Sequence, residues 1–160
     1  GSVLFTDLVG FTEFTDVNGD RAAVEVLDRQ SAIVAGRLGD GRLVKELGDG
    51  LLLWFGDATA GVDTARRLQD AIAAARDRGE FPLPVRMAMH AGTVIERGDD
   101  VVGQTVNVAA RVAELAAPGE VLVTEQLVRA VDARTYRFRA VGPTRVKGVG
   151  APIWLHRLEC

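Results

Sequence analysis

Short apolar runs and helically spaced apolar positions alternate along the chain, and together they predict a mixed fold. Runs rich in Val, Leu and Phe are typical of buried strands. Such runs occur at Val3–Phe5, on both sides of Gly48-Asp49-Gly50, at Val85–Ala91 and at Val121–Val123. Apolar residues spaced by three and four predict helices over 20–38, 58–78 and 103–115, and a shorter helix is predicted over 125–131.

The two longest predicted helices each have one apolar face that we expect to be buried. In the first helix this face is formed by Val24, Leu27, Ser31, Val34 and Leu38. In the second it is formed by Val62, Ala65, Leu68, Ile72 and Ala75.

The positions of glycine and proline indicate how the strands are connected. Gly48-Asp49-Gly50 between two apolar runs predicts a hairpin, and a second short hairpin is predicted over 92–100. Residues 136–158 predict extended strands with turns at Gly142-Pro143 and at 148–152. Strands joined by hairpins are antiparallel. The order of elements therefore predicts an α+β fold with a ferredoxin-like split β-α-β core, a largely antiparallel sheet with helices on one face, and additional C-terminal strands.

Composition narrows the class of protein. The 160 residues predict a single domain over 1–160, and Gly1-Ser2 resembles the remnant of a cleaved tag. Hydrophobic content of 48% and charged content of 26% are typical of soluble globular proteins, and no apolar run approaches the roughly 18 residues of a membrane span. No secretory leader precedes the first predicted strand, and the lone cysteine, Cys160, excludes an internal disulfide; both favour a cytoplasmic location. A net charge of −3 argues against a nucleic-acid partner.

Two aspartates stand where the predicted topology can bring them together. Asp7 ends the first strand and Asp49 lies at the tip of the central hairpin. Two neighbouring carboxylates could hold two Mg²⁺ or Mn²⁺ ions about 4 Å apart. Gly10 permits a tight turn, after which the amides of Phe11 and Thr12 would begin a helix and bind phosphate. The simpler interpretations are a helix cap for Asp7 and a turn residue for Asp49.

The use of lysine points to a second pair of residues. Among 19 Lys and Arg residues, only Lys45 and Lys147 are lysine. Lys45 lies on the strand that enters the central hairpin, and Asp100 lies just before Gly103 and the third long helix. A donor and an acceptor facing each other across a pocket match the edge of adenine, whereas guanine would leave both unpaired. The alternative is two exposed charges on a solvated surface.

The helix predicted over 103–115 has one polar stripe. This stripe is formed by Gln104, Asn107, Arg111 and Glu114, whereas the other positions are apolar or small. Asn107 and Arg111 lie one turn apart and could reach a ribose and a developing phosphate charge. A wet face of an ordinary amphipathic helix explains the stripe equally well. His90 and His156 lie among apolar residues and are interpreted as core or edge histidines, and no Walker-type loop, Gly-x-Ser-x-Gly motif or zinc spacing is present.

Four segments in order resemble the class III nucleotidyl cyclase catalytic domain. These segments, FTDLVGFT, VKELGDG, DVVGQTVNVAAR and RVKG, are spread over nearly the whole chain. The resemblance implies metal binding by Asp7 and Asp49, phosphate contacts from the backbone of Gly10, Phe11 and Thr12, and purine selection by Lys45 and Asp100. It also implies that Asn107 and Arg111 stabilise the transition state and that Lys147 binds the outer phosphates. The purine pair matches the adenylyl pattern.

The resemblance further implies a reaction and a partner. The expected reaction converts ATP to 3′,5′-cyclic AMP and pyrophosphate by in-line attack of the ribose 3′-hydroxyl on the α-phosphate, assisted by two divalent cations. Metal carboxylates come from one protomer of such cyclases and the remaining groups from the other, so a homodimer with two shared sites is expected. A regulatory domain in a longer protein is also compatible with the family. The alternatives are a guanylate cyclase, or a non-catalytic cyclase-homology module that senses nucleotide or dimerises.

Overall fold

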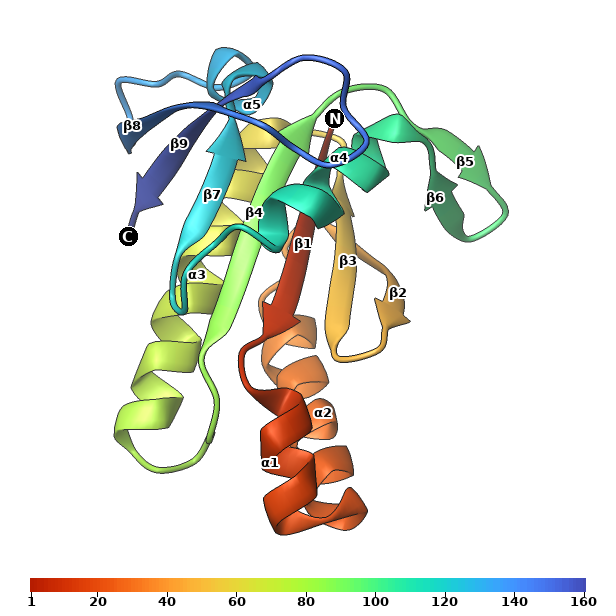
Figure 1. Cartoon of the computed structure of the whole chain (residues 1–160), viewed down its shortest axis with the longest axis vertical. Coiled ribbons are helices and arrows are strands. Elements are labelled where there is room, and N and C mark those ends of the chain that lie inside the picture. Colours follow the sequence, from red (N-terminus) through yellow and green to blue (C-terminus); the bar gives the residue numbers. More distant parts are fainter.

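The computed structural model describes all residues 1–160 as a seven-stranded sheet, a two-stranded ribbon and five helices (Figure 1). The strands of the large sheet are β1 (Ser2–Leu8), β2 (Arg42–Leu47), β3 (Gly50–Phe55), β4 (Val85–Ala91), β7 (Val121–Thr124), β8 (Arg137–Thr144) and β9 (Ile153–Glu159). The ribbon is formed by β5 (Ile95–Arg97) and β6 (Asp100–Val102). The helices are α1 (Phe11–Asn18), α2 (Asp20–Ala35), α3 (Ala58–Asp77), α4 (Gln104–Ala113) and α5 (Glu125–Arg129).

The order of strands confirms the predicted α+β class. The sheet runs β2-β3-β1-β4-β7-β9-β8, and every neighbouring pair is antiparallel except β4 and β7. Its first four strands, β2-β3-β1-β4, have the arrangement of a split β-α-β core. The C-terminal strands extend the sheet beyond β4, as expected.

Helices cover both faces of the sheet, so the prediction that they all lie on one face is wrong. Met87 and Met89 of β4 point into the large core formed with α3, whereas Ala88 between them packs against α4. Side chains alternate between the faces of a strand, so these neighbours define opposite sides. The second face is also apolar, and α4 buries its own apolar side there. Figure 1 shows α4 and α3 on opposite sides of the sheet.

The first predicted helix is the least accurate prediction, whereas the second is confirmed. The helix begins at Asp20 as predicted, but it ends at Ala35 and not at Leu38. Val34 is buried as predicted, whereas Val24 is 54% exposed because Ala23, Val26 and Gln30, each one residue earlier than expected, form the rest of the buried face. By contrast, all five residues expected to line the inner face of α3 are buried.

Turns near the C-terminus and after β4 also differ from expectation. β8 continues through Gly142-Pro143 with a bulge between Ala140 and Gly142, so the predicted turn there is wrong. A bulge allows the strand to continue through the glycine and the proline, because it accommodates an extra residue in one strand of the pair. The small hairpin spans Ile95–Val102 rather than 92–100. None of the five helices is both long enough and apolar enough to span a membrane.

Candidate active site

Asp7 and Asp49 come from neighbouring strands and lie at the same end of the sheet. Asp7 is opposite Gly50 in the β1–β3 register, which places Asp49 next to it at the hairpin tip. This approach requires glycine at position 50, because a Cβ there would lie 2.7 Å from the carbonyl oxygen of Thr6. The buried side chain of Gln30 in α2 donates a hydrogen bond to the carbonyl of Asp49 at 3.4 Å. Backbone pairing and a helix side chain therefore both fix the tip beside the end of β1.

The two carboxylates interact electrostatically. Burial, and then the proximity of Asp7, raise the pKa of Asp49 to about 6. Burial and the neighbouring carboxylate disfavour the ionised form of Asp49, and a cation bound between the two carboxylates would favour it. The donors are oxygens, which suit hard cations such as Mg²⁺ or Mn²⁺. No group of three or more His, Cys, Asp or Glu side chains suited to a metal occurs in the chain, so substrate oxygens or water would have to complete the ligand set.

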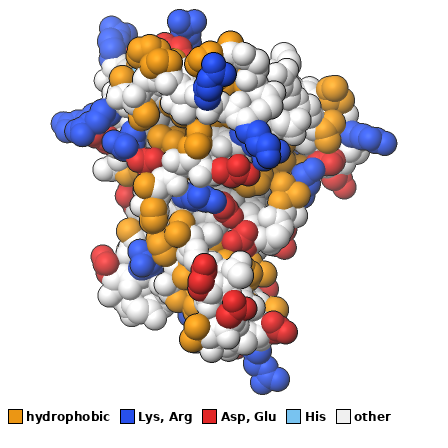
Figure 2. All heavy atoms as spheres, in the orientation of Figure 1, with side chains coloured by type: hydrophobic (Ala, Val, Ile, Leu, Met, Phe, Trp, Pro, Cys, Tyr) orange, Lys and Arg blue, Asp and Glu red, His pale blue; other side chains and the backbone are white.

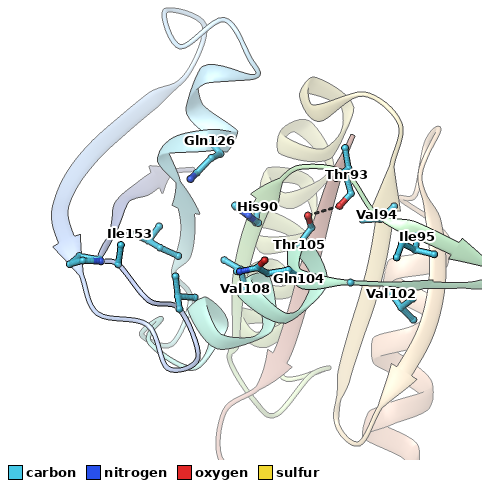
Figure 3. Close-up of a pocket in the computed structure, with 14 residues that line it drawn as sticks. His90, Thr93, Val94, Ile95, Val102, Gln104, Thr105, Val108, Gln126 and Ile153 are labelled. Carbon is cyan, nitrogen blue, oxygen red and sulfur yellow. Dashed lines mark hydrogen bonds between the residues drawn. The ribbon is translucent and has the colours of Figure 1, made fainter.

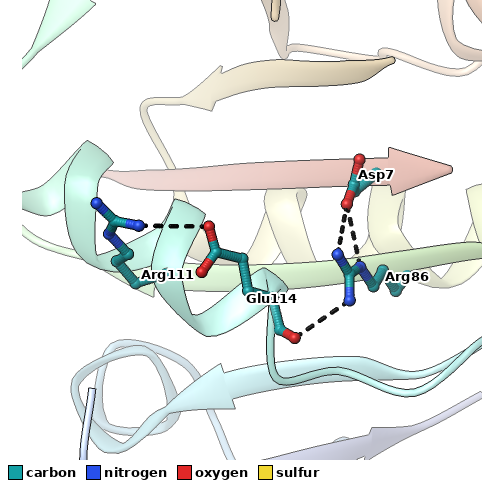
Figure 4. Close-up of polar contacts among 4 residues, drawn as sticks. All are labelled: Asp7, Arg86, Arg111 and Glu114. Carbon is teal, nitrogen blue, oxygen red and sulfur yellow. Dashed lines mark hydrogen bonds and ion pairs between the residues drawn. The ribbon is translucent and has the colours of Figure 1, made fainter. Parts of the chain in front are cut away.

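Arg86 of β4 is, with Gln30, a residue at this site that the sequence analysis missed. Its Nε and Nη2 atoms donate to Oδ2 of Asp7 at 3.1 and 2.8 Å, and its Nη1 donates to the carbonyl of Glu114 at 3.1 Å (Figure 4). Arg86 also lowers the pKa of Asp49, against the effect of Asp7. The available signal was an arginine inside the otherwise apolar strand VRMAMHA, but its partner lies 79 residues away.

The turn after β1 has the expected form. Gly10 adopts a left-handed conformation with φ of 81° and precedes α1, which begins at Phe11. No side chain caps this helix, so Asp7 does not have the capping role considered above. The amides of the first turn, including those of Phe11 and Thr12, therefore remain available to an anion.

Lys45 and Asp100 face each other, as their proposed role requires. Lys45 Nζ lies 2.9 Å from Oδ1 and 3.2 Å from Oδ2 of Asp100, although β2 and β6 belong to different sheets. The amide of Val101 donates to Oδ1 of Asp100 at 2.8 Å. These contacts, with the Lys45 hydrogen bond first, hold the pKa of Asp100 below its usual value. The two charges are thus paired with each other, although the Lys45 side chain is 33% exposed and that of Asp100 is 40% exposed.

Asn107, Arg111 and Lys147 line one cleft of about 520 Å³. The first two belong to the exposed stripe of α4, and Lys147 belongs to the segment between β8 and β9. Val146 is buried in the core beneath α4 and so anchors this segment next to the helix. Arg111 Nη1 lies 3.4 Å from Oε1 of Glu114, one turn further along the stripe.

A neighbouring hollow of about 470 Å³ contains none of the predicted site residues (Figure 3). Its walls are formed by α4, the β5–β6 ribbon and the segment leading into β9, and Thr105 donates to the carbonyl of Thr93 at 2.6 Å. His90 lies at its base, where burial lowers the pKa of the imidazole and Nδ1 pairs with the Thr124 hydroxyl at 2.7 Å. His90 is therefore a core residue, as predicted.

The site residues fall into three separate groups in one chain. The carboxylates lie at the end of β1, the purine pair lies between β2 and β6, and the cleft beside α4 contains neither Asp7 nor Asp49. On the visible face, acidic side chains are more frequent toward the end occupied by α1, and basic side chains toward the opposite end (Figure 2). No single cleft of the chain contains the complete set.

Comparisons with known proteins agree on one family. A family model described as the adenylate and guanylate cyclase catalytic domain matches residues 2–158. An adenylate cyclase of Streptomyces coelicolor is 38% identical over 82% of this chain and 35% of its own length. A pH-sensitive adenylate cyclase of Mycobacterium tuberculosis is 30% identical over 99% of this chain and 40% of its own length.

The adenylyl cyclase CyaB of Pseudomonas aeruginosa has the same fold. Its structure superposes with a TM-score of 0.86 at 22% identity, covering 99% of this chain and 93% of that chain. The curated relatives are longer, since the first three are matched over only 20% to 40% of their length.

Proposed function

The chain belongs to the class III nucleotidyl cyclases, and from this membership we propose that it converts ATP to 3′,5′-cyclic AMP and pyrophosphate. The observation that carries the choice of ATP is the ion pair between Lys45 and Asp100, at 2.9 Å. Adenine accepts a hydrogen bond at N1 and donates one from N6, so it can bind a lysine and a carboxylate together. Guanine presents the reverse pattern and would leave both groups without partners, which discriminates strongly.

Asp7 and Asp49 are proposed to hold the metal ions. Their proximity supports this role, because burial and the neighbouring Asp7 both raise the pKa of Asp49, and a bound cation would favour its ionised form. Two divalent cations, Mg²⁺ or Mn²⁺, would supply activation of the ribose 3′-hydroxyl and neutralisation of the triphosphate. The amides after Gly10 lie next to Asp7 in sequence and are placed to bind phosphate oxygens.

Asn107, Arg111 and Lys147 are proposed to act on the ribose and phosphates. Their common cleft supports this role, since it places an amide and two cations around one space. Asn107 would orient the ribose, and Arg111 would stabilise the charge that develops on the α-phosphate. A donor aimed at such charge contributes about 10²–10³ in rate. Lys147 would bind the outer phosphates as a compact, mobile charge.

We propose that two copies of the chain share each active site. Asp7 and Asp49 do not line the α4 cleft of their own chain, which supports this arrangement. In a two-fold dimer, the carboxylates of one protomer would meet the α4 cleft of its partner, and symmetry would create two equivalent sites. A single protomer would then be inactive.

Product analysis tests the proposal. The purified protein is incubated with ATP or GTP in the presence of Mg²⁺ or Mn²⁺ at several protein concentrations, and cyclic nucleotide is quantified. We expect cyclic AMP to dominate and the specific activity to rise with protein concentration. Cyclic GMP as the main product would refute the purine assignment, and nucleotide binding without any cyclic product would identify a non-catalytic module.

Asp7→Ala and Asp49→Ala provide the mechanistic test. Each change should abolish turnover, because the remaining carboxylate cannot hold two cations. Folding is verified by circular dichroism and thermal melting. Near-normal rates in either variant would remove the two-metal explanation.

A further inference from the structure

The β5–β6 ribbon, which carries Asp100, is held against β2 by side chains and not by a strand ladder. The ribbon forms a sheet of its own and stands apart from the large sheet (Figure 1). Val101 is fully buried in a cluster with Val3 and Leu52, and so fixes the ribbon from the core side. The position of Asp100 relative to Lys45 therefore depends on the remaining contacts between the ribbon and β2.

A β-bulge in β2 determines which of its side chains face the ribbon. The register of β2 with β3 shifts between Leu43 and Lys45. Arg42 lies opposite Trp54, and Lys45 lies opposite Leu52. Trp54 and Leu52 are two positions apart and share the face of β3 that packs toward the ribbon. Arg42 and Lys45 therefore lie on the same face, although residues three apart on a regular strand lie on opposite faces.

Arg42 contacts the ribbon at the residue before Asp100. Its Nη1 atom donates to the carbonyl oxygen of Asp99 at 2.8 Å, and its Nη2 atom lies 3.6 Å from Oε1 of Glu96 on β5. The Asp99 carbonyl belongs to the planar peptide unit that joins Asp99 to Asp100. A donor that fixes this oxygen also fixes the plane from which the Asp100 side chain departs.

The contact between Asp100 and Lys45 benefits from this support. Lys45 Nζ lies 2.9 Å from Oδ1 of Asp100, but the Asp100 side chain is 40% exposed. An ion pair with this exposure contributes little by itself, because water competes for both partners. Two adjacent residues of the ribbon are thus held by two side chains of β2, Asp99 by Arg42 and Asp100 by Lys45.

We propose that Arg42 is a positioning residue that holds Asp100 opposite Lys45 and so sharpens the selection of adenine. The inference rests on the proposed role of Lys45 and Asp100 in purine selection. Arg42 acts through the peptide between Asp99 and Asp100, and not through the purine itself. Selection depends on this support, because a carboxylate that can turn toward water no longer penalises a purine that fails to pair with it.

Titration of the Asp100 carboxyl tests its position without nucleotide. Isotope-labelled protein is titrated with acid and followed by carboxyl-detected NMR, and the Asp100 signal is assigned from its loss in Asp100→Asn. Arg42→Met keeps a long apolar side chain but has no donor. In this variant the pKa of Asp100 should rise toward its usual value, because the hydrogen bond from Lys45 that lowers it forms less often. Arg42→Lys retains one donor without the fork and should give an intermediate pKa.

Two variants of the ribbon separate positioning from charge. Glu96→Gln removes the ion-pair partner of Arg42 but leaves the bond to the Asp99 carbonyl, so the pKa of Asp100 should change little. Arg97 acts on Asp100 by charge alone, without a hydrogen bond. Arg97→Met therefore measures the loss of one nearby positive charge, and Arg42→Met should raise the pKa of Asp100 by more.

Equilibrium binding measures the consequence for purine selection. The analogues 3′-deoxy-ATP and 3′-deoxy-GTP lack the attacking hydroxyl, and calorimetry in the presence of Mn²⁺ gives the Kd of each. The preference for adenine is the ratio of the two Kd values. It should fall about fivefold in Arg42→Met, because a hydrogen bond to a charged group contributes about tenfold or more in affinity and is only partly lost. In Glu96→Gln and Arg97→Met it should stay within about twofold of the natural chain.

An unchanged pKa of Asp100 in Arg42→Met, or a rise no larger than that in Arg97→Met, would overturn the inference. A natural chain that prefers adenine and an Arg42→Met variant with the same preference would also overturn it. Equal binding of both analogues by the natural chain, or binding of neither, would instead refute the purine assignment, and the carboxyl titration alone would then decide the role of Arg42. If Arg42→Met does not fold, Arg42→Lys is compared with the natural chain in the same measurements.

Discussion

Asp49 is a single residue whose ionised carboxylate lowers the stability of the folded chain. Burial and Asp7 raise its pKa to about 6 from 3.8, so the folded chain binds a proton more tightly than the unfolded chain does. The stabilising contribution of protonated Asp49 is complete below about pH 4 and is lost as the pH rises through 6. At neutral pH, the ionised carboxylate is therefore a cost to the metal-free fold.

Asp49→Asn should increase the free energy of unfolding at pH 7.5 by about 1 kcal/mol. The full linkage value for the shift is about 3 kcal/mol, and we reduce it because the carboxylate is partly exposed and screened by water. This gain in the free energy of unfolding should vanish near pH 3.5, where the aspartate and the asparagine side chains are both uncharged in the folded chain. Urea unfolding in the presence of EDTA measures the free energy of unfolding at each pH.

Asp99→Asn is the control for this stability gain. Asp99 lies on the exposed turn between β5 and β6 and loses the same charge. Its free energy of unfolding should change by less than about 0.5 kcal/mol at either pH. A destabilised Asp49→Asn at pH 7.5 would contradict the electrostatic explanation. Mn²⁺ should raise the melting temperature of the natural chain more than that of Asp49→Asn, since only the former retains both carboxylates.

Nucleotide preference is a second property that belongs to single residues. Lys45→Glu combined with Asp100→Cys replaces the donor by an acceptor and removes the opposing carboxylate. The ratio of kcat/KM for GTP to that for ATP should rise at least tenfold, because the exchanged donor and acceptor now match guanine. Initial rates with both nucleotides measure the ratio, and an unchanged preference for ATP would exclude this pair as the purine selector.

The residue pairs differ in how far the sequence could predict them. The proximity of Asp7 to Asp49 could be predicted, because one lies at a strand end and the other at a hairpin tip. The proximity of Lys45 to Asp100 could be predicted from the motifs that contain them. Arg86 and Gln30 were not. Arg86 reaches Asp7 across the β1–β4 pair, and Gln30 reaches the Asp49 carbonyl from α2. Such contacts depend on three-dimensional placement that no local spacing encodes.

At the scale of elements, the β2–β3 hairpin positions Asp49 through Gly50. Gly50→Ala should destabilise the protein by about 2 kcal/mol, because the added Cβ would lie 2.7 Å from the backbone oxygen of Thr6 and 3.3 Å from that of Leu47. Thr6 belongs to β1 and Leu47 to β2, so moving either backbone oxygen disturbs the pairing of β3 with a neighbouring strand. Denaturant unfolding measures the loss, and Mn²⁺ binding should weaken as the tip shifts away from Asp7.

Gly56→Ala serves as the control for the hairpin. Gly56 follows β3 and lacks a positive φ, and a Cβ added to it would have no atom within 4 Å. Its unfolding free energy should change by less than about 0.5 kcal/mol. A Gly50→Ala protein as stable as this control would mean that β1 and β3 are not held at the separation described.

Elements with a regular pattern of apolar residues were predicted well. An element whose position relative to the sheet is not encoded in its own pattern was not. The buried face of α3 and the bounds of β4 agree with the sequence analysis, because helical spacing and a bounded apolar run are strong signals. The placement of α4 on the second face was missed. Its apolar side shows that it is buried, but not which face of the sheet buries it.

At the scale of the whole molecule, the proposed dimer makes an assortment experiment possible. Asp7→Ala removes a group from the carboxylate half of a site, and Arg111→Ala removes one from the α4 half. The two inactive proteins are mixed in equal amounts and refolded together. The mixture should recover about a quarter of the activity of the natural chain. Half of the dimers are then mixed, and each mixed dimer has one intact site of two. Cyclic AMP formation at saturating ATP measures the recovery.

The same experiment with two variants of one half excludes trivial rescue. Asp7→Ala mixed with Asp49→Ala leaves every site of every dimer without one carboxylate, so no activity should return. Sites contained within one chain would predict no recovery in either mixture, because each chain would bring its own defect to its own site. Recovery only in the mixture of Asp7→Ala with Arg111→Ala therefore requires that one copy supplies the carboxylates and its partner the α4 groups.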